Sequence, residues 1–181
     1  SKTFKITAIA LSDIQVGDIP AQAYQKGGNK PDVKIHDTFN EVDLVLGKDY
    51  TLTYSNNKKQ GTASVAIKGK GNYSGTVKKT FEITAADLGA WKAEAADKAY
   101  SKKKNAYKSA LTIIDVNGKK LAAGTDYDKN LVYTYENDTK LDEQTYRQAG
   151  KIVSKNDIPP AGTVIRVTAN GKGNYNGSVS T

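Results

Sequence analysis

Apolar and polar residues alternate along several short stretches of the chain, which is the pattern of a half-buried β-strand. These stretches are residues 33–35, 51–54, 63–67 and 80–83, and later residues 111–113, 133–135 and 164–167. Clusters of glycine and asparagine separate them and are typical of tight turns. One stretch, residues 85–99, has helical composition, and we expect a linker with one helical turn there. The matching earlier stretch, residues 8–23, looks extended. The pattern predicts an all-β sandwich.

The chain contains two copies of one pattern. GTASVAIKGKGNYSG at 61–75 returns as GTVIRVTANGKGNYNG at 162–177, and LGKDY at 46–50 returns within LAAGTDY at 121–127. The offset between the copies is 77 residues at Tyr50 and Tyr127 (127 − 50) and 102 at Tyr73 and Tyr175 (175 − 73). The second copy therefore carries 25 extra residues (102 − 77), mostly as an insertion at 138–161. We expect copy one at 8–86, copy two at 87–181, and the insertion to project as an extra hairpin or long excursion.

A set of turn and core residues in copy one resembles a known bacterial repeat. The set comprises Tyr24, Pro31-Asp32-Val33, Gly47-x-Asp49-Tyr50, Tyr54-x-Asn56-Asn57, Gly61-Thr62-Ala63, Gly69-Lys70-Gly71-Asn72-Tyr73-x-Gly75 and Phe81-x-Ile83. It is similar to the bacterial Ig-like tandem repeats of large secreted and cell-wall-attached proteins of gut Clostridia and related Gram-positive bacteria. The resemblance implies two tandem immunoglobulin-like β-sandwich domains and an extracellular location, at the cell surface or secreted. Copy two departs from it with Ser109 in place of Pro31, the insertion, and no final Phe-x-Ile strand.

Composition narrows the possible functions. The chain has no cysteine and a single histidine, His36, so we expect no catalytic triad, no metal site, no cofactor and no enzymatic activity. Its net charge is +8, but only Arg147 and Arg166 are arginine. Lysine is a hydrated point charge that recognises base edges poorly, so nucleic acid is not an expected partner. A cell-wall or host glycan or protein surface is an expected partner. No apolar run approaches the roughly 20 residues that span a bilayer, so no membrane insertion is expected.

Several local motifs invite a chemical interpretation. The GKGNY element could suggest a phosphate loop, but strand patterns on both sides favour a tight turn in which the Tyr73 hydroxyl bonds to the backbone. The acidic residues group as Asp37, Glu41 and Asp43 and as Asp138, Asp142 and Glu143, which we interpret as solvated loop charge rather than a calcium site. His36 is expected to face solvent. Lys–Asn or Lys–Asp crosslinks are chemically available, but no spacing selects a pair.

The aromatic residues define the candidate ligand face. We match four tyrosine pairs between the copies: Tyr24/Tyr100, Tyr50/Tyr127, Tyr54/Tyr135 and Tyr73/Tyr175. Four aromatics have no counterpart, and with an arginine from the insertion they form the predicted face: Trp91, Tyr107, Tyr133, Tyr146 and Arg147. The alternative is that Trp91 packs at the junction between the copies and Tyr146 caps the insertion.

The first seven residues repeat the last strand of copy one. SKTFKIT at 1–7 and KKTFEIT at 78–84 are identical at five positions. Residues 1–7 therefore look like the last strand of a preceding repeat. We expect Phe4 and Ile6 to lie along the start of copy one, or to fill the open edge of copy two in a neighbouring molecule. The chain is then a monomer or a weak head-to-tail chain.

Two functions follow from these observations. The first is a non-enzymatic structural or adhesion segment, a spacer or stalk, of a surface or secreted multidomain protein. The alternative is a carbohydrate- or mucin-binding module that uses the unmatched aromatics and the insertion.

Overall fold

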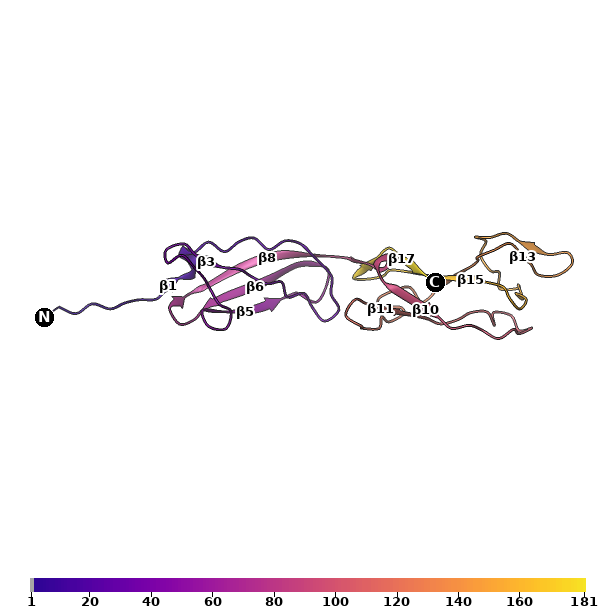
Figure 1. Cartoon of the computed structure of the whole chain (residues 1–181), viewed down its shortest axis with the longest axis horizontal. Helices are drawn as coiled ribbons and strands as arrows, with labels where there is room; N and C mark the ends of the chain where they lie inside the picture. Colours follow the sequence, from indigo (N-terminus) through magenta and orange to yellow (C-terminus); the bar gives the residue numbers. More distant parts are fainter. Residues whose placement is uncertain (1) are drawn as a thin grey trace. The chain divides into compact units, whose positions relative to one another are not determined.

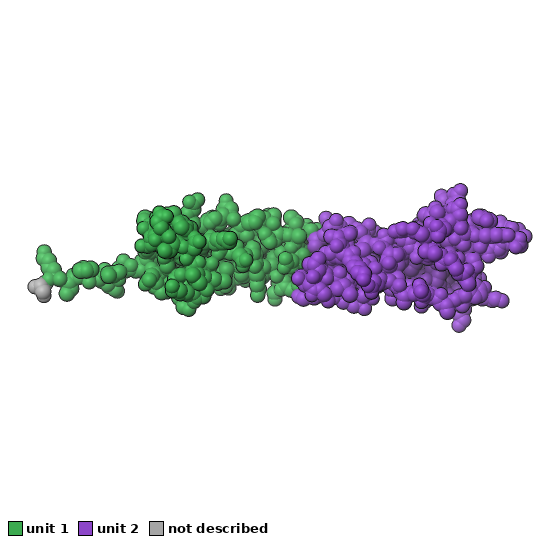
Figure 2. Space-filling model, viewed as in Figure 1, with its two compact units in different colours: residues 1–85 green, residues 86–181 purple. Residues whose placement is uncertain are grey.

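The computed structural model describes residues 2–181 and divides the chain into two compact units. Unit 1 comprises residues 1–85 and unit 2 residues 86–181 (Figure 2). Within the described part, the only helical elements are two 3-10 turns, and the rest of the regular structure is strand. The chain is therefore all-β, and its several small sheets are consistent with a β-sandwich. The immunoglobulin-like topology stays a prediction.

Unit 1 is built around a four-stranded sheet of order β2-β8-β6-β5 (Figure 1). Its elements are β1 (Ile9–Ala10), η1 (Leu11–Asp13), β2 (Gln22–Ala23), β3 (His36–Asp37), β4 (Val42–Asp43), β5 (Tyr50–Ser55), β6 (Gly61–Gly69), β7 (Tyr73–Ser74) and β8 (Thr76–Thr84). Strands β1 and β7 form a parallel pair, and β3 and β4 an antiparallel hairpin. Alternate residues of β6 and β8, including Val65, Ile67 and Phe81, are buried, as the alternating pattern predicts.

Unit 2 has a three-stranded sheet of order β12-β15-β17 and three two-stranded pairs. Its elements are β9 (Ala86–Asp87), η2 (Leu88–Ala90), β10 (Lys92–Ala95), β11 (Leu111–Ile114), β12 (Val132–Tyr135), β13 (Thr139–Lys140), β14 (Tyr146–Arg147), β15 (Ile165–Asn170), β16 (Tyr175–Asn176) and β17 (Ser178–Ser180). The pairs are β9 with β16, β10 with β11, and β13 with β14. Buried Ile113, Tyr135 and Val167 belong to its core.

Both units repeat the same internal contacts. The buried Tyr50 donates a hydrogen bond to the Val33 carbonyl at 2.6 Å, and its counterpart Tyr127 donates to the Leu111 carbonyl at 3.3 Å. An aspartate just before each tyrosine accepts a backbone N–H four residues earlier in the chain. The aspartate–tyrosine motif shared by the two copies therefore closes a loop over the core.

The GKGNY element is a turn between strands. Gly69 donates a backbone hydrogen bond to Gly75 in unit 1, and Gly171 donates to Gly177 in unit 2. A Cβ on Gly69 would lie 2.7 Å from the Ser74 amide nitrogen, so only glycine fits this close approach. The backbone N–H groups of Gly69, Lys70 and Tyr73 donate to carbonyls within unit 1, which agrees with a structural role.

Two expectations for copy one were wrong. The Tyr73 hydroxyl donates to the side chain of Asp37 at 2.9 Å, not to the backbone. Asp37 is fully buried rather than solvated. Its carboxylate also accepts hydrogen bonds from the Asn40 side chain and from the Phe39 amide, which satisfies its charge. The hydrogen bond from Asn40 is the main reason that the pKa of Asp37 is lowered.

The stretch with helical composition forms one 3-10 turn, as expected, at Leu88–Ala90. The matching stretch of copy one is not fully extended, because Leu11–Asp13 forms the same turn. Both Leu11 and Leu88 are completely buried, so each turn places a leucine in the core of its unit.

The tyrosine matching needs one correction. Tyr54 lies opposite Val65 and bonds to the Pro31 carbonyl, while Tyr133 lies opposite Val167 and bonds to the Ser109 carbonyl. The counterpart of Tyr54 is therefore Tyr133, and Tyr135 is unmatched. Both candidates are an even number of residues from Tyr127, so strand alternation alone could not separate them.

The N-terminal segment does not lie along unit 1. Residues 2–7 belong to no strand, and the side chains of Phe4 and Ile6 are 90% and 87% exposed. The first of the two placements expected for them is wrong, and the second stays a prediction.

Candidate functional site

The insertion in unit 2 is the main departure from the repeated pattern. The predicted extra hairpin is present: Thr139 pairs with Arg147, and Lys140 with Tyr146. After the hairpin the chain returns along the free edge of β12, where Val153 donates to the Tyr133 carbonyl at 2.9 Å. The insertion is thus partly a hairpin and partly an added edge of the sheet.

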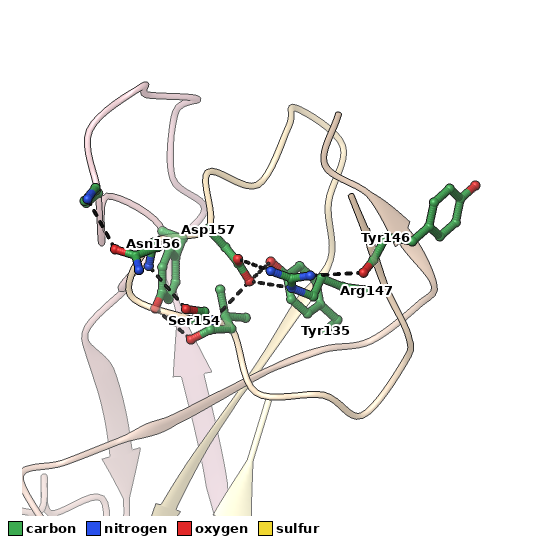
Figure 3. A network of polar contacts seen from close by, with 9 residues as sticks. Tyr135, Tyr146, Arg147, Ser154, Asn156 and Asp157 are labelled. Atoms are coloured by element: carbon green, nitrogen blue, oxygen red, sulfur yellow. Dashed lines mark hydrogen bonds and ion pairs between the residues drawn. The ribbon is translucent and has the colours of Figure 1, made fainter. Parts of the chain in front are cut away.

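A buried carboxylate ties the insertion to the core (Figure 3). Asp157 is only 4% exposed. Arg147 donates to it twice, from Nε at 3.0 Å and from Nη2 at 2.7 Å. The Tyr135 hydroxyl donates at 2.9 Å, and the Ser154 amide at 3.1 Å. Four hydrogen bonds therefore satisfy one carboxylate, and they join β12, β14 and the end of the insertion.

The same contacts set the electrostatics of this network. Burial alone would raise the pKa of Asp157, but the hydrogen bonds from Arg147, Tyr135 and Ser154 outweigh burial, so its pKa is lowered. The pKa of Tyr135 is raised by burial and by the adjacent carboxylate. Asp157 is therefore an anion that acts as a hydrogen-bond acceptor, and neither it nor Tyr135 is poised to exchange protons near neutral pH.

Tyr107 and Tyr133 are a packed pair. Their rings are 5.6 Å apart and nearly perpendicular. The Tyr107 hydroxyl donates to the Val153 carbonyl at 3.1 Å, and the Tyr133 hydroxyl donates to Ser109. Both tyrosines hold the insertion and the preceding loop in place.

Trp91 and Tyr146 lie in different surroundings. The Trp91 ring packs edge-on against Tyr175, with ring centroids 5.1 Å apart. Tyr146 is 66% exposed, and its ring points away from the Asp157 network (Figure 3). Of the five predicted residues, the structure brings together Tyr107 with Tyr133, places Arg147 on Asp157, and leaves Tyr146 facing solvent. Whether they bind a ligand stays a prediction.

A pocket of about 310 Å³ opens beside the Tyr107–Tyr133 pair. Its lining includes Tyr100, Ile165 and Val167. Its other walls come from the loop after β10, from β12 and from the end of the insertion at residues 159–163.

The described residues hold no cluster of three or more metal-ligating side chains. His36 is exposed, as expected, and its Nδ1 lies 2.7 Å from the Asp43 carboxylate. Lys104 Nζ donates to the Asn156 side-chain oxygen at 3.2 Å on the surface. In the part of the chain that is described, no helix has the length and apolar character needed to traverse a bilayer.

Comparisons with known proteins found no matching protein-family model, no matching curated protein and no matching solved structure.

Proposed function

We propose that the chain is a non-enzymatic structural or adhesion segment, a spacer or stalk, of a bacterial multidomain protein that is secreted or attached to the cell surface. One observation carries the proposal. The contacts present in both units, such as the Tyr50 and Tyr127 hydroxyl bonds, close loops over a core. A tandem array conserves its scaffold in this way when each unit has to fold on its own.

The insertion supports the same conclusion. Its one buried charge, Asp157, is fully occupied by Arg147, Tyr135 and the Ser154 amide. Four donors thus occupy the Asp157 carboxylate within the protein, which supports a structural role for it. The insertion then serves to cover and extend the edge of unit 2.

Charge indicates the surroundings in which such a segment works. The chain carries 27 basic residues against 19 acidic ones, and 25 of the basic residues are lysine. Dispersed lysines favour a loose attraction to anionic polymers such as those of a cell wall. We therefore propose an extracellular location and a glycan- or wall-coated surface as the neighbour.

The proposal is tested by deleting both units from the parent surface protein. The distance between the distal domain and the cell wall should shorten, while the catalytic rate or ligand affinity of that purified domain stays unchanged. A lost catalytic rate would contradict the proposal.

A carbohydrate-binding module is the second candidate, and Tyr146 is the observation in its favour. An exposed aromatic ring on a hairpin strand is a suitable platform for a sugar. A glycan array decides between the two functions. Reproducible binding that Tyr146→Ala abolishes would favour the module, and silence across the array would favour the spacer.

A further inference from the structure

Strand β5 is the outer strand of the unit 1 sheet, and β6 is its partner strand among the described residues (Figure 1). Backbone groups of successive residues in an antiparallel strand point to alternate sides. The Asp49 carbonyl accepts a hydrogen bond from Lys70, which directly follows β6, so it points toward β6. The Tyr50 carbonyl accepts one from Gly47 instead, so it points away from β6.

Two further residues of β5 direct their backbone groups to this outer side. Leu52 and Tyr54 are in step with Tyr50, so their N–H and C=O groups also point away from β6. No described backbone group bonds to Leu52 or Tyr54 from the outer side. Two donors and two acceptors are therefore available at the edge of β5, in the arrangement with which one strand binds another.

In unit 2 the corresponding edge is covered. The Tyr133 carbonyl, the counterpart of the Tyr54 carbonyl, accepts a hydrogen bond from Val153 of the insertion at 2.9 Å. The Tyr135 amide donates to the Lys151 carbonyl at 3.0 Å. Unit 1 has no insertion, so the edge of β5 is open where the edge of β12 is paired.

Strand β5 also lacks the features that keep edge strands from pairing, which are charged residues, proline and bulges. Its sequence, YTLTYS, contains no charged residue, proline or glycine. The segment that forms the edge in unit 2 differs, because it carries Lys151 beside the exposed Ile152. The open edge of unit 1 is thus the one without a charge.

We propose that β5 is a self-association edge, which pairs antiparallel with β5 of a second copy of the chain about a two-fold axis at Thr53. Leu52 of each copy then lies opposite Tyr54 of the other, and each of these two pairs exchanges two hydrogen bonds. All the outward N–H and C=O groups of Leu52 and Tyr54 are satisfied. Two identical edges paired in this way close as a dimer. The dimer is independent of the spacer function.

The structure favours this register over its neighbours. A shift in one direction brings in Tyr50, whose carbonyl already accepts from Gly47. A shift in the other direction brings in Asn56, which has a φ of 56° and lies outside the strand.

The side chains of β5 fit a second copy of the same strand. Thr51, Thr53 and Ser55 are exposed on the outer face of the sheet. In the proposed register Thr53 lies opposite Thr53 of the other copy, and Thr51 lies opposite Ser55. Threonine–threonine and threonine–serine pairs are favourable across antiparallel strands. The net charge of +8 does not oppose the contact at the paired strands, because neither strand carries a charge.

Disulfide trapping tests the pairing, because the chain has no cysteine of its own. The two Thr53 residues form a non-hydrogen-bonded pair with a Cα separation of about 4.5 Å, which suits a disulfide. The Thr53→Cys chain is incubated in a glutathione redox buffer, and the disulfide-linked dimer is quantified by mass spectrometry.

The matched controls are Thr51→Cys and Ser55→Cys, which lie on the same exposed face. Each lies about 14 Å from its own equivalent in the dimer, since four residues of strand separate them. We expect several-fold more dimer from Thr53→Cys than from either control alone, and a mixed disulfide when the two controls are combined. Equal dimer yields from the three single variants would overturn the proposal.

Sedimentation of chains without cysteine provides a second test. We expect the unaltered chain to form a dimer as its concentration rises. The Thr53→Lys variant, which places two lysines opposite each other at the axis, should lose this dimer while its circular dichroism stays unchanged. Undiminished dimerisation of Thr53→Lys would overturn the proposal. An unaltered chain that stays monomeric throughout would also overturn it, in favour of another extended peptide as the occupant of the edge.

Discussion

Arg147 donates two parallel hydrogen bonds to the buried carboxylate of Asp157, with N–O distances of 2.7 and 3.0 Å. This pair anchors the hairpin of unit 2 to its core. Arg166, the other arginine of the chain, makes the same two-bonded pair with Glu136, but on the surface. The two pairs share their chemistry and differ in burial.

Because the two ion pairs differ in burial, removing Arg147 and removing Arg166 should lower the free energy of unfolding by different amounts. Arg147→Ala leaves the Asp157 carboxylate buried with fewer donors and should destabilise unit 2 by about 1–3 kcal/mol. Arg166→Ala breaks an exposed pair and should cost less than about 1 kcal/mol. Trp91 is the only tryptophan and lies in unit 2, so its fluorescence during urea unfolding reports this unit selectively. Equal costs for the two variants would contradict the structural role given to Asp157.

The lowered pKa of Asp157 predicts the effect of acid. The unfolded chain binds a proton at this aspartate near its ordinary pKa of about 3.9, whereas the folded unit binds it only at lower pH. The stabilisation is therefore present above about pH 4 and is lost as the pH falls through the folded pKa. The urea midpoint of Trp91 fluorescence should fall between about pH 6 and pH 3. The Asp157→Asn variant should have a lower urea midpoint near neutral pH, and its midpoint should fall less steeply as the pH is lowered. A variant whose midpoint falls with pH as steeply as that of the unaltered chain would contradict this account.

Phe4 and Phe81 provide a matched test of burial. They occupy the same place in nearly identical sequences, yet Phe4 is 90% exposed and Phe81 is 3% exposed. Phe81→Ala should destabilise unit 1 by about 3–5 kcal/mol. Phe4→Ala should change its stability by less than about 0.5 kcal/mol. Thermal unfolding followed by circular dichroism at low protein concentration measures both, and a similar loss from both variants would show that the N-terminal segment contributes to unit 1.

Much of the fold could be predicted from the sequence because strand alternation and turn residues are local signals. The alternation in residues 63–67 and the glycines of the GKGNY turns predict strands and turns directly, and the change of offset between the copies predicts the insertion. The alignment of the two copies was wrong for the counterpart of Tyr54, because strand alternation fits two tyrosines equally well. Tyr133 and Tyr135 point to the same face of one strand, so only their acceptors, Ser109 and Asp157, distinguish them.

The polar network could not be predicted for a related reason. Arg147 and Asp157 are ten residues apart and meet because the chain returns along β12 after the hairpin. Nothing in their spacing selects this pair over another acidic residue of the insertion. Likewise, the burial of Asp37 depends on Tyr73, which is 36 residues away and reaches it through the tertiary fold.

The central claim is that the two units act as a spacer, and a domain exchange in the parent surface protein tests it most directly. Both units are replaced by two unrelated β-sandwich domains of the same total length, and adhesion of cells with equal surface display is measured. The spacer account predicts that the exchanged protein retains adhesion, while deletion of both units loses it, because length alone matters. Loss of adhesion in the exchanged protein would contradict the account and show that these units themselves recognise a partner.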